Sequence, residues 1–210
     1  MMPPDMLAAF FVASVALGIA PGPDNLFVLT QSTLHGARAG VMVVLGLCTG
    51  LLVHTAAVAA GLAALIQASA IAFTILKAMG AAYLLWLAWQ AWRAAGTSAA
   101  GTIRASGALS ARQYFLRGIA MNLSNPKVSL FFLAFLPQFA YPARGALVPQ
   151  LLLLGSVFIV ATLLVFGAIA LAAARLGKWL GSAPGAHTWL NRVAALIFVA
   201  LAARLALPGR

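Results

Sequence analysis

Two residues of opposite charge follow prolines inside long apolar segments of this chain. Asp24 follows Pro23 in "APGPDNLFVLTQ", and Lys127 follows Pro126 in "NLSNPKVSL". The chain has only two acidic residues among its 210, and burying a carboxylate in a membrane is costly enough to indicate a function. We therefore predict that Asp24 binds a proton or a cationic group. The structural alternative is that Asp24 caps the helix that follows the break, and one carboxylate could serve both roles.

The polar side chains near these charges each have a functional and a structural interpretation. Lys127 is predicted either to contact the substrate or to neutralise Asp24. Three asparagines are predicted either to contact the substrate or to satisfy freed backbone groups: Asn25, Asn122 and Asn125. His54, in the second apolar segment, is predicted either to relay protons or to form a hydrogen bond between helices.

Prolines interrupt the first and fourth apolar segments near their middles. The interruptions are Pro21-Gly22-Pro23 and Asn125-Pro126. Proline lacks a backbone donor and clashes with the preceding turn, so each interruption leaves unpaired backbone groups, which a membrane tolerates only inside protein or against a water-filled cavity. The helix that restarts after each break points its free N–H groups at that cavity. We predict that the two breaks form a polar site for a small zwitterion.

The composition indicates an integral membrane protein. Hydrophobic residues make up 64% of the chain and charged residues 7%, and the mean hydropathy is +1.04, whereas soluble domains carry about 25% charged residues. A membrane-spanning helix needs about 20 residues. Six apolar segments are predicted to span the membrane, at about 7–31, 40–66, 69–92, 114–137, 147–174 and 189–207. Arg192 and Arg204 shorten the apolar centre of the sixth segment, so a five-span arrangement is the alternative.

The segment 94–113, which has no aromatic or acidic residue, divides the chain into two halves of three apolar segments, 1–93 and 114–210. Three spans per half invert the second half relative to the first, and helices broken at corresponding positions are typical of inverted-repeat transporters. Aligning Pro23 with Pro126 places Asp24 opposite Lys127. We therefore predict an all-α polytopic membrane protein with six transmembrane helices in two inverted three-helix repeats, in which helices one and four are broken.

The basic residues predict the orientation, because Lys and Arg are enriched in cytoplasmic loops. With the N-terminus outside, the inner side receives Arg38, Arg93, Arg104, Arg112, Arg117, Arg175, Lys178 and Arg192, and the outer side receives Lys77, Arg144, Arg204 and Arg210. We therefore predict that both termini lie outside, that 94–113 is a cytoplasmic linker, and that Trp86, Trp89 and Trp92 form an inner aromatic belt. Because the basic residues are dispersed singly, the net charge of +11 predicts no nucleic-acid partner.

Four motifs resemble the lysine-exporter (LysE) superfamily, specifically its homoserine/threonine-resistance (RhtB) branch. They are "PGPDNLFVLTQS", "HGARAGVMVVLGLCTGLLVH", "LKAMGAAYLLWLAW" and "NLSNPKVSLFFLAFLPQF", of which the first and last are specific to the family. The resemblance covers nearly the whole chain and implies a multi-pass exporter of amino acids or related small metabolites in the inner membrane, driven by the proton gradient. It places the family's PGP segment on Pro21, Gly22 and Pro23 and its NPK segment on Asn125, Pro126 and Lys127.

Two other functions stay open from the sequence. A metal or inorganic-ion exporter on a related scaffold would require more intramembrane acids and histidines than this chain has, and a non-transporting membrane scaffold leaves the matched breaks unexplained. The sequence has no HExxH or GxSxG motif, so we predict no enzyme activity, cofactor or resident metal. The expected partners are an amino-acid substrate, protons and the lipid bilayer, and a homodimer stays open.

Overall fold

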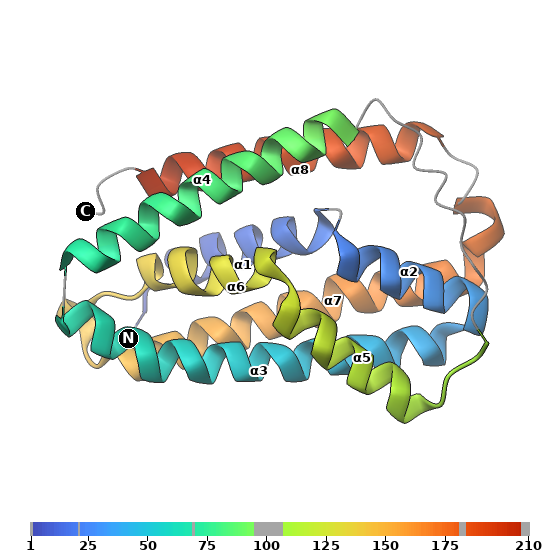
Figure 1. Cartoon of the computed structure of the whole chain (residues 1–210), viewed down its shortest axis with the longest axis horizontal. Helices are drawn as coiled ribbons and strands as arrows, with labels where there is room; N and C mark the ends of the chain where they lie inside the picture. The colour runs from blue at the N-terminus through green and yellow to red at the C-terminus, as the bar shows by residue number, and fades with distance from the viewer. Residues whose placement is uncertain (1, 21, 69, 95–106, 181–183, 207–210) are drawn as a thin grey trace.

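The computed structural model describes residues 2–20, 22–68, 70–94, 107–180 and 184–206, and every regular element within them is helical (Figure 1). The first half contains α1 (Pro4–Ile19), α2 (Pro23–His35), α3 (Ala37–Ala68) and α4 (Ala70–Ala94). The second half begins with α5 (Ala111–Ser124), α6 (Pro126–Leu130), the π-helix η1 (Phe131–Phe135) and the 3₁₀ helix η2 (Leu136–Phe139). It continues with the 3₁₀ helix η3 (Pro142–Arg144), α7 (Leu147–Leu180) and α8 (Pro184–Ala206). The predicted all-α class is confirmed.

Two helices are long and apolar enough to cross a membrane, α3 over Ala37–Gly61 and α7 over Leu147–Arg175. Two helix pairs pass the same test together but are bent at a break: α1 with α2, by 62°, and α5 with Pro126–Phe139, by 52°. Counting each bent pair as one span gives up to four candidate spans in the described part of the chain. The third and sixth predicted segments form α4 and α8, which fall outside this set.

The packing of the helices brings the two breaks to the middle of the molecule. α3 packs along α5 and α7, α1 and α2 pack on α7, and α4 packs along α8. Figure 1 shows α1 and α6 in one half of the molecule and α2 and α5 in the other, with both breaks between the halves. We call α1 with Pro126–Phe139 the aromatic half and α2 with α5 the polar half.

The aromatic half is filled by buried phenylalanines. Neighbouring rings lie with their centroids 4.9 to 6.4 Å apart, and the cluster consists of Phe10, Phe131, Phe132, Phe135, Phe139 and Phe158. The chain around it passes from α-helix through η1 to η2, where Pro137 is the second residue. Proline cannot donate the backbone hydrogen bond of a regular α-helix. Pro137 therefore explains why the helix type changes just before it.

α3 crosses α5 at glycines. A Cβ at Gly46 would meet the carbonyl oxygen of Phe115 and lie 2.9 Å from Gly118 Cα, and a Cβ at Gly50 would lie 2.6 Å from Asn122 Oδ1. Small residues let two helix backbones approach closely, and Gly46 and Gly50 do so here. This close crossing places Asn122, near the end of α5, against α3.

The first residues of α5 lie within the predicted linker 94–113. Ser110 Oγ accepts a hydrogen bond from the Gln113 N–H, and Gln113 Oε1 accepts one from the Ser110 N–H. This capping box satisfies free donors at the helix start, so α5 begins at Ala111, three residues before the predicted apolar segment. Residues 95–106 of the linker lie outside the described residues.

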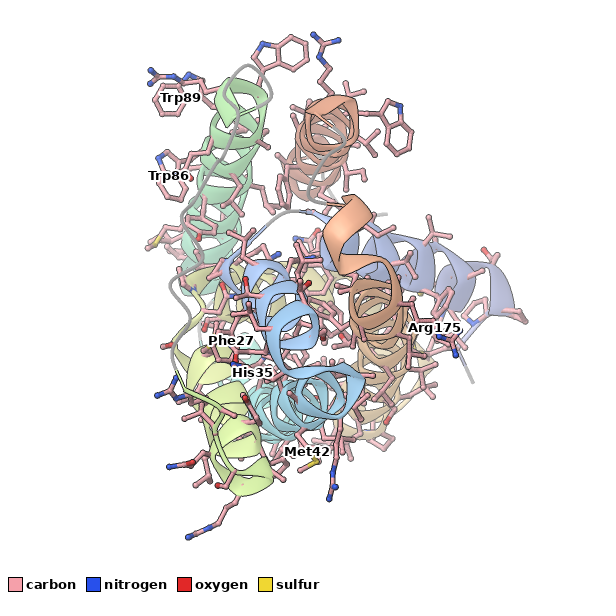
Figure 2. The ribbon with its side chains drawn as sticks, turned by 90° about the vertical axis from the view of Figure 1, so that its right-hand side faces the viewer. Phe27, His35, Met42, Trp86, Trp89 and Arg175 are labelled. Carbon is pink, nitrogen blue, oxygen red and sulfur yellow. The ribbon has the colours of Figure 1, made fainter. Side chains whose placement is uncertain are left out.

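The tryptophans of α4 are exposed on the outside of the molecule. Trp86, Trp89 and Trp92 are all exposed, and Figure 2 shows Trp86 and Trp89 pointing away from the other helices. The Arg93 guanidinium lies 4.9 Å from the centroid of the Trp89 ring. Exposed aromatic rings beside an arginine suit a membrane interface.

Candidate substrate and proton site

Each broken helix restarts at a proline that follows an extended residue. Gly22 has φ −165° and ψ 175°, and Asn125 has φ −79° and ψ 107°. Pro23 and Pro126 are the first residues of α2 and α6. Proline disfavours a helical conformation in the preceding residue and is well tolerated at the first helical position, so local sequence explains both breaks. Both predicted interruptions are confirmed, although Pro21 lies outside the described residues.

Asn125 joins the two breaks. Its side-chain nitrogen donates a 2.8 Å hydrogen bond to Asp24 Oδ2, and its side-chain oxygen accepts a 3.0 Å hydrogen bond from the Lys127 backbone N–H. Asn125 therefore caps α6. The capping position of α2 is Gly22, which has no side chain, so Asp24 does not act as the helix cap. Its carboxylate instead contacts the second break.

The Lys127 side chain contacts the end of α1 and not the Asp24 carboxylate. Its Nζ donates hydrogen bonds to Ala20 O at 3.1 Å and Leu17 O at 3.4 Å, where the helix dipole favours a cation. A Cβ at Gly22 would lie 3.0 Å from Nζ, so the glycine leaves room for the ammonium. Among the described residues, no hydrogen bond joins Lys127 Nζ directly to Asp24.

A small cavity lies between the breaks. Its wall includes Leu17, Asp24, Leu51, Asn122, Lys127 and Thr162. Its volume of about 20 Å³ leaves room for about one water molecule. Three buried oxygens at the breaks have no hydrogen-bond partner in the described structure: Asp24 Oδ1, Asn25 Oδ1 and Asn122 Oδ1. Burying an acceptor without a hydrogen-bond partner costs free energy. The site is therefore suited to a hydrogen-bond donor such as an ammonium group, or to protonation of the carboxylate.

Asn25 and His54 each make a hydrogen bond of the kind that their structural interpretations predict, and the Asn25 side-chain oxygen stays unpaired. Asn25 Nδ2 donates a 2.7 Å hydrogen bond to Gly18 O, a carbonyl near the end of α1. His54 Nε2 lies 3.4 Å from Asn122 O, so it links α3 to α5. The His54 ring also lies 5.5 Å from that of Phe132. His54 therefore contacts Asn122, which lines the cavity, but does not line the cavity itself.

Sequence reasoning misses Thr162, which lines the cavity from α7 and is buried. The sequence feature that could have identified Thr162 is its hydroxyl group in the middle of a long apolar segment. The apolar walls, such as Leu51 and Phe158, carry no such signal, because the sequence does not separate them from the other apolar residues of α3 and α7.

The chain matches known proteins over nearly its whole length. The family model described as the LysE type translocator matches residues 15–209. The chain belongs to the LysE family of translocators. This family member is 38% identical over 198 residues to the homoserine/homoserine lactone efflux protein of Salmonella typhimurium, covering 94% of each chain. It is also 30% identical over 201 residues to a leucine efflux protein of an Enterobacter species, covering 96% of this chain and 92% of that protein.

Membership in the LysE family confirms the predicted resemblance, the membrane class and the absence of enzyme activity. No solved structure matches this family member. The part of the chain that the structure describes has no group of three or more His, Cys, Asp or Glu side chains placed to hold a metal ion. The polar groups at the breaks are one carboxylate, one ammonium and three amide side chains.

Proposed function

We propose that this LysE family member is a secondary active exporter of amino acids or related small metabolites in the inner membrane, coupled to protons at the two helix breaks. The relatives named for homoserine/homoserine lactone efflux and leucine efflux support the substrate class. The observation that carries the proposed site is the buried Asp24 carboxylate, whose Oδ1 is unpaired beside a cavity.

The groups around the cavity complement both ends of an amino acid. A substrate ammonium has three donors. The unpaired oxygens of Asp24 and Asn122 in the cavity wall are acceptors, as is that of Asn25 at the first break. The Lys127 ammonium has three donors and makes two hydrogen bonds, so one donor is available for a substrate carboxylate. The first N–H groups of α2 lack a side-chain cap and supply further donors at the positive end of the helix dipole.

Asp24 couples substrate to protons by holding one or the other. Asn125 occupies Oδ2, so Oδ1 is the oxygen that exchanges partners. When ionised, Asp24 attracts the substrate ammonium; when protonated, it loses that attraction and releases the substrate. Alternation between these two states is the minimum requirement for proton antiport.

Transport also requires a change of conformation. Pockets that bind small molecules usually have volumes of about 300 Å³ or more, whereas this cavity has about 20 Å³. An amino acid therefore enters only when the two halves of a broken helix move apart. The described conformation is a closed one.

The proposal includes six spans arranged as inverted repeats with the boundaries 1–93, 94–113 and 114–210, and part of the helix packing supports the repeats. Aligning the two prolines pairs α1 with α5, α3 with α7 and α4 with α8. Exchanging the two halves then turns the packing of α1 on α7 into that of α5 on α3. The same exchange leaves the α3–α7 and α4–α8 contacts unchanged. The distribution of basic residues supports both termini outside, which places the polar half towards the cytoplasm.

Proteoliposomes test the proposal. Purified protein is assayed with labelled homoserine, leucine, threonine and lysine for two reactions, pH-gradient-driven transport and substrate exchange without a gradient. Asp24→Asn is expected to lower gradient-driven transport at least about tenfold, the loss expected for one charge-assisted contact, while exchange stays measurable. Measurable exchange shows that the variant is folded.

The double variant Asp24→Asn with Lys127→Gln distinguishes coupling from a structural pairing of charges. If the two residues only neutralise each other, removing both charges relieves the unpaired charge and restores gradient-driven transport. That restoration, or a wild-type protein that exchanges none of the amino acids, would overturn the proposal.

A further inference from the structure

A second, larger cavity lies at the end of the molecule where α2 meets α3. Its volume is about 340 Å³, and its wall includes His35, Arg38, Met42, Leu109 and Tyr114. Figure 2 views this end directly and shows His35 and Met42 on it. We call this cavity the vestibule. Its volume falls in the range of pockets that bind small molecules.

The vestibule offers hydrogen-bond donors and no acidic side chain. Arg38 is exposed, and its guanidinium has no partner among the described residues. The Tyr114 side chain is 4% exposed; its oxygen accepts a 3.1 Å hydrogen bond from the Leu109 N–H, which leaves its own O–H free to donate. The His35 ring lies 6.1 Å from the Tyr114 ring. Arginine and tyrosine donors without a nearby carboxylate suit an anion, and a carboxylate in particular.

Two buried polar side chains lie on α2 between the vestibule and Asp24. Gln31 and Ser32 lie on α2 between Asp24 and His35, both are buried, and Ser32 Oγ has no hydrogen-bond partner in the described structure. At 1.5 Å per residue, His35 is about 16 Å along the helix from Asp24. The aromatic half has phenylalanines beyond its break instead. Only Val28 separates the two buried polar residues from Asp24 on the buried face of α2. Polar groups on the helix that leads inward from the vestibule favour a substrate over a lipid headgroup, which would make no use of them.

We propose that the vestibule binds the carboxylate of the amino acid before it enters the central cavity, through Arg38 and the Tyr114 hydroxyl. This inference rests on the proposed export function and names its cytoplasmic entry site. It adds a second binding site to the one at the breaks. While the carboxylate is bound in the vestibule, the substrate ammonium stays in water.

Kinetics of transport from the vestibule side test the proposal. In oriented proteoliposomes, Arg38→Gln and Tyr114→Phe are each expected to raise KM for homoserine or leucine about tenfold, the effect of one lost charge-assisted hydrogen bond, with kcat nearly unchanged. Arg175→Gln is the matched control: Arg175 is exposed at the same end, apart from His35 and Met42 (Figure 2), and its KM is expected to equal that of the wild type.

A substrate without a carboxylate and a change of lipid complete the test. The same variants are expected to leave KM unchanged for leucinamide or homoserine lactone, if these are transported, and to act equally in vesicles of phosphatidylcholine alone and with added phosphatidylglycerol. An unchanged KM in both variants, while the wild type still transports, overturns the vestibule proposal and leaves the export function standing. An effect that appears only with phosphatidylglycerol assigns the vestibule to lipid and overturns it equally.

Discussion

The two segments that follow the breaks begin alike and then differ. α2 and the segment Pro126–Phe139 both start with proline, and both place a buried charged residue second, Asp24 or Lys127. Beyond these residues α2 remains a regular helix and buries Gln31 and Ser32, whereas the other segment changes helix type and buries phenylalanines. Counted along the chain from the proline that begins each segment, the same position is Ser32 in α2 and Phe135 in the other segment.

Two breaks with the same local sequence pattern therefore need not lead into equivalent surroundings. Tightly packed aromatic rings exclude water and resist separation. A buried hydroxyl without a partner gains from hydration instead. We therefore expect the polar half to separate more easily than the aromatic half.

The pair Phe135→Ala and Ser32→Ala tests this contrast, with the largest expected effect. Phe135→Ala is expected to lower the free energy of unfolding by about 3 kcal/mol, at the low end for buried aromatic residues because lipid also solvates the ring in the unfolded state. Ser32→Ala is expected to change it by less than about 0.5 kcal/mol, because no hydrogen bond is lost. Unfolding in SDS measures both, and equal losses would contradict the contrast.

Glycines on the first halves of the broken helices give a second comparison, with an intermediate effect. A Cβ at Gly118 would lie 3.0 Å from Gly46 Cα and 3.1 Å from Leu47 N, whereas one at Gly18 would make an ordinary 3.4 Å contact with Val165 Cγ1. Gly118→Ala is therefore expected to cost about 2 kcal/mol by forcing α3 and α5 apart. Gly18→Ala should be neutral or slightly stabilising, because alanine favours the helix.

The same SDS unfolding assay measures the glycine variants, with Gly61→Ala as control. A Cβ at Gly61 would have no described atom within 4 Å, so this variant should not lose stability. A Gly118→Ala variant as stable as the Gly61→Ala variant would show that the two helices do not pack at this crossing.

The prolines themselves provide the third comparison, with the smallest effect on stability. Pro23→Ala is expected to reduce transport more than Pro126→Ala, while each changes the free energy of unfolding by only about 1 kcal/mol. Asn125 still caps α6 and bonds Asp24 when Pro126 is replaced, whereas α2 has no side-chain cap and, among the described residues, its break is bridged only from within α2, by Asn25 to Gly18 O, and by Lys127. Exchange assays in proteoliposomes, with expression in the membrane as control, measure the difference; a reversed order would mean that Asn125 does not stabilise its break.

Local sequence is sufficient to predict the helical class, the position of both breaks and the charged residue after each. These features depend on interactions between neighbours in the chain: proline acts on the residue before it, and apolar composition selects helices in a membrane.

Tertiary structure alone decides which partners the polar groups find. Asp24 could have capped its own helix or paired with Lys127, but the packing of α5 on α3 brings Asn125 to its carboxylate and leaves Lys127 on the carbonyls of Leu17 and Ala20. The vestibule likewise forms only where Tyr114 of α5 meets His35 and Arg38. Such contacts join residues far apart in sequence, and they depend on the distances between helix backbones, which apolar patterns do not specify.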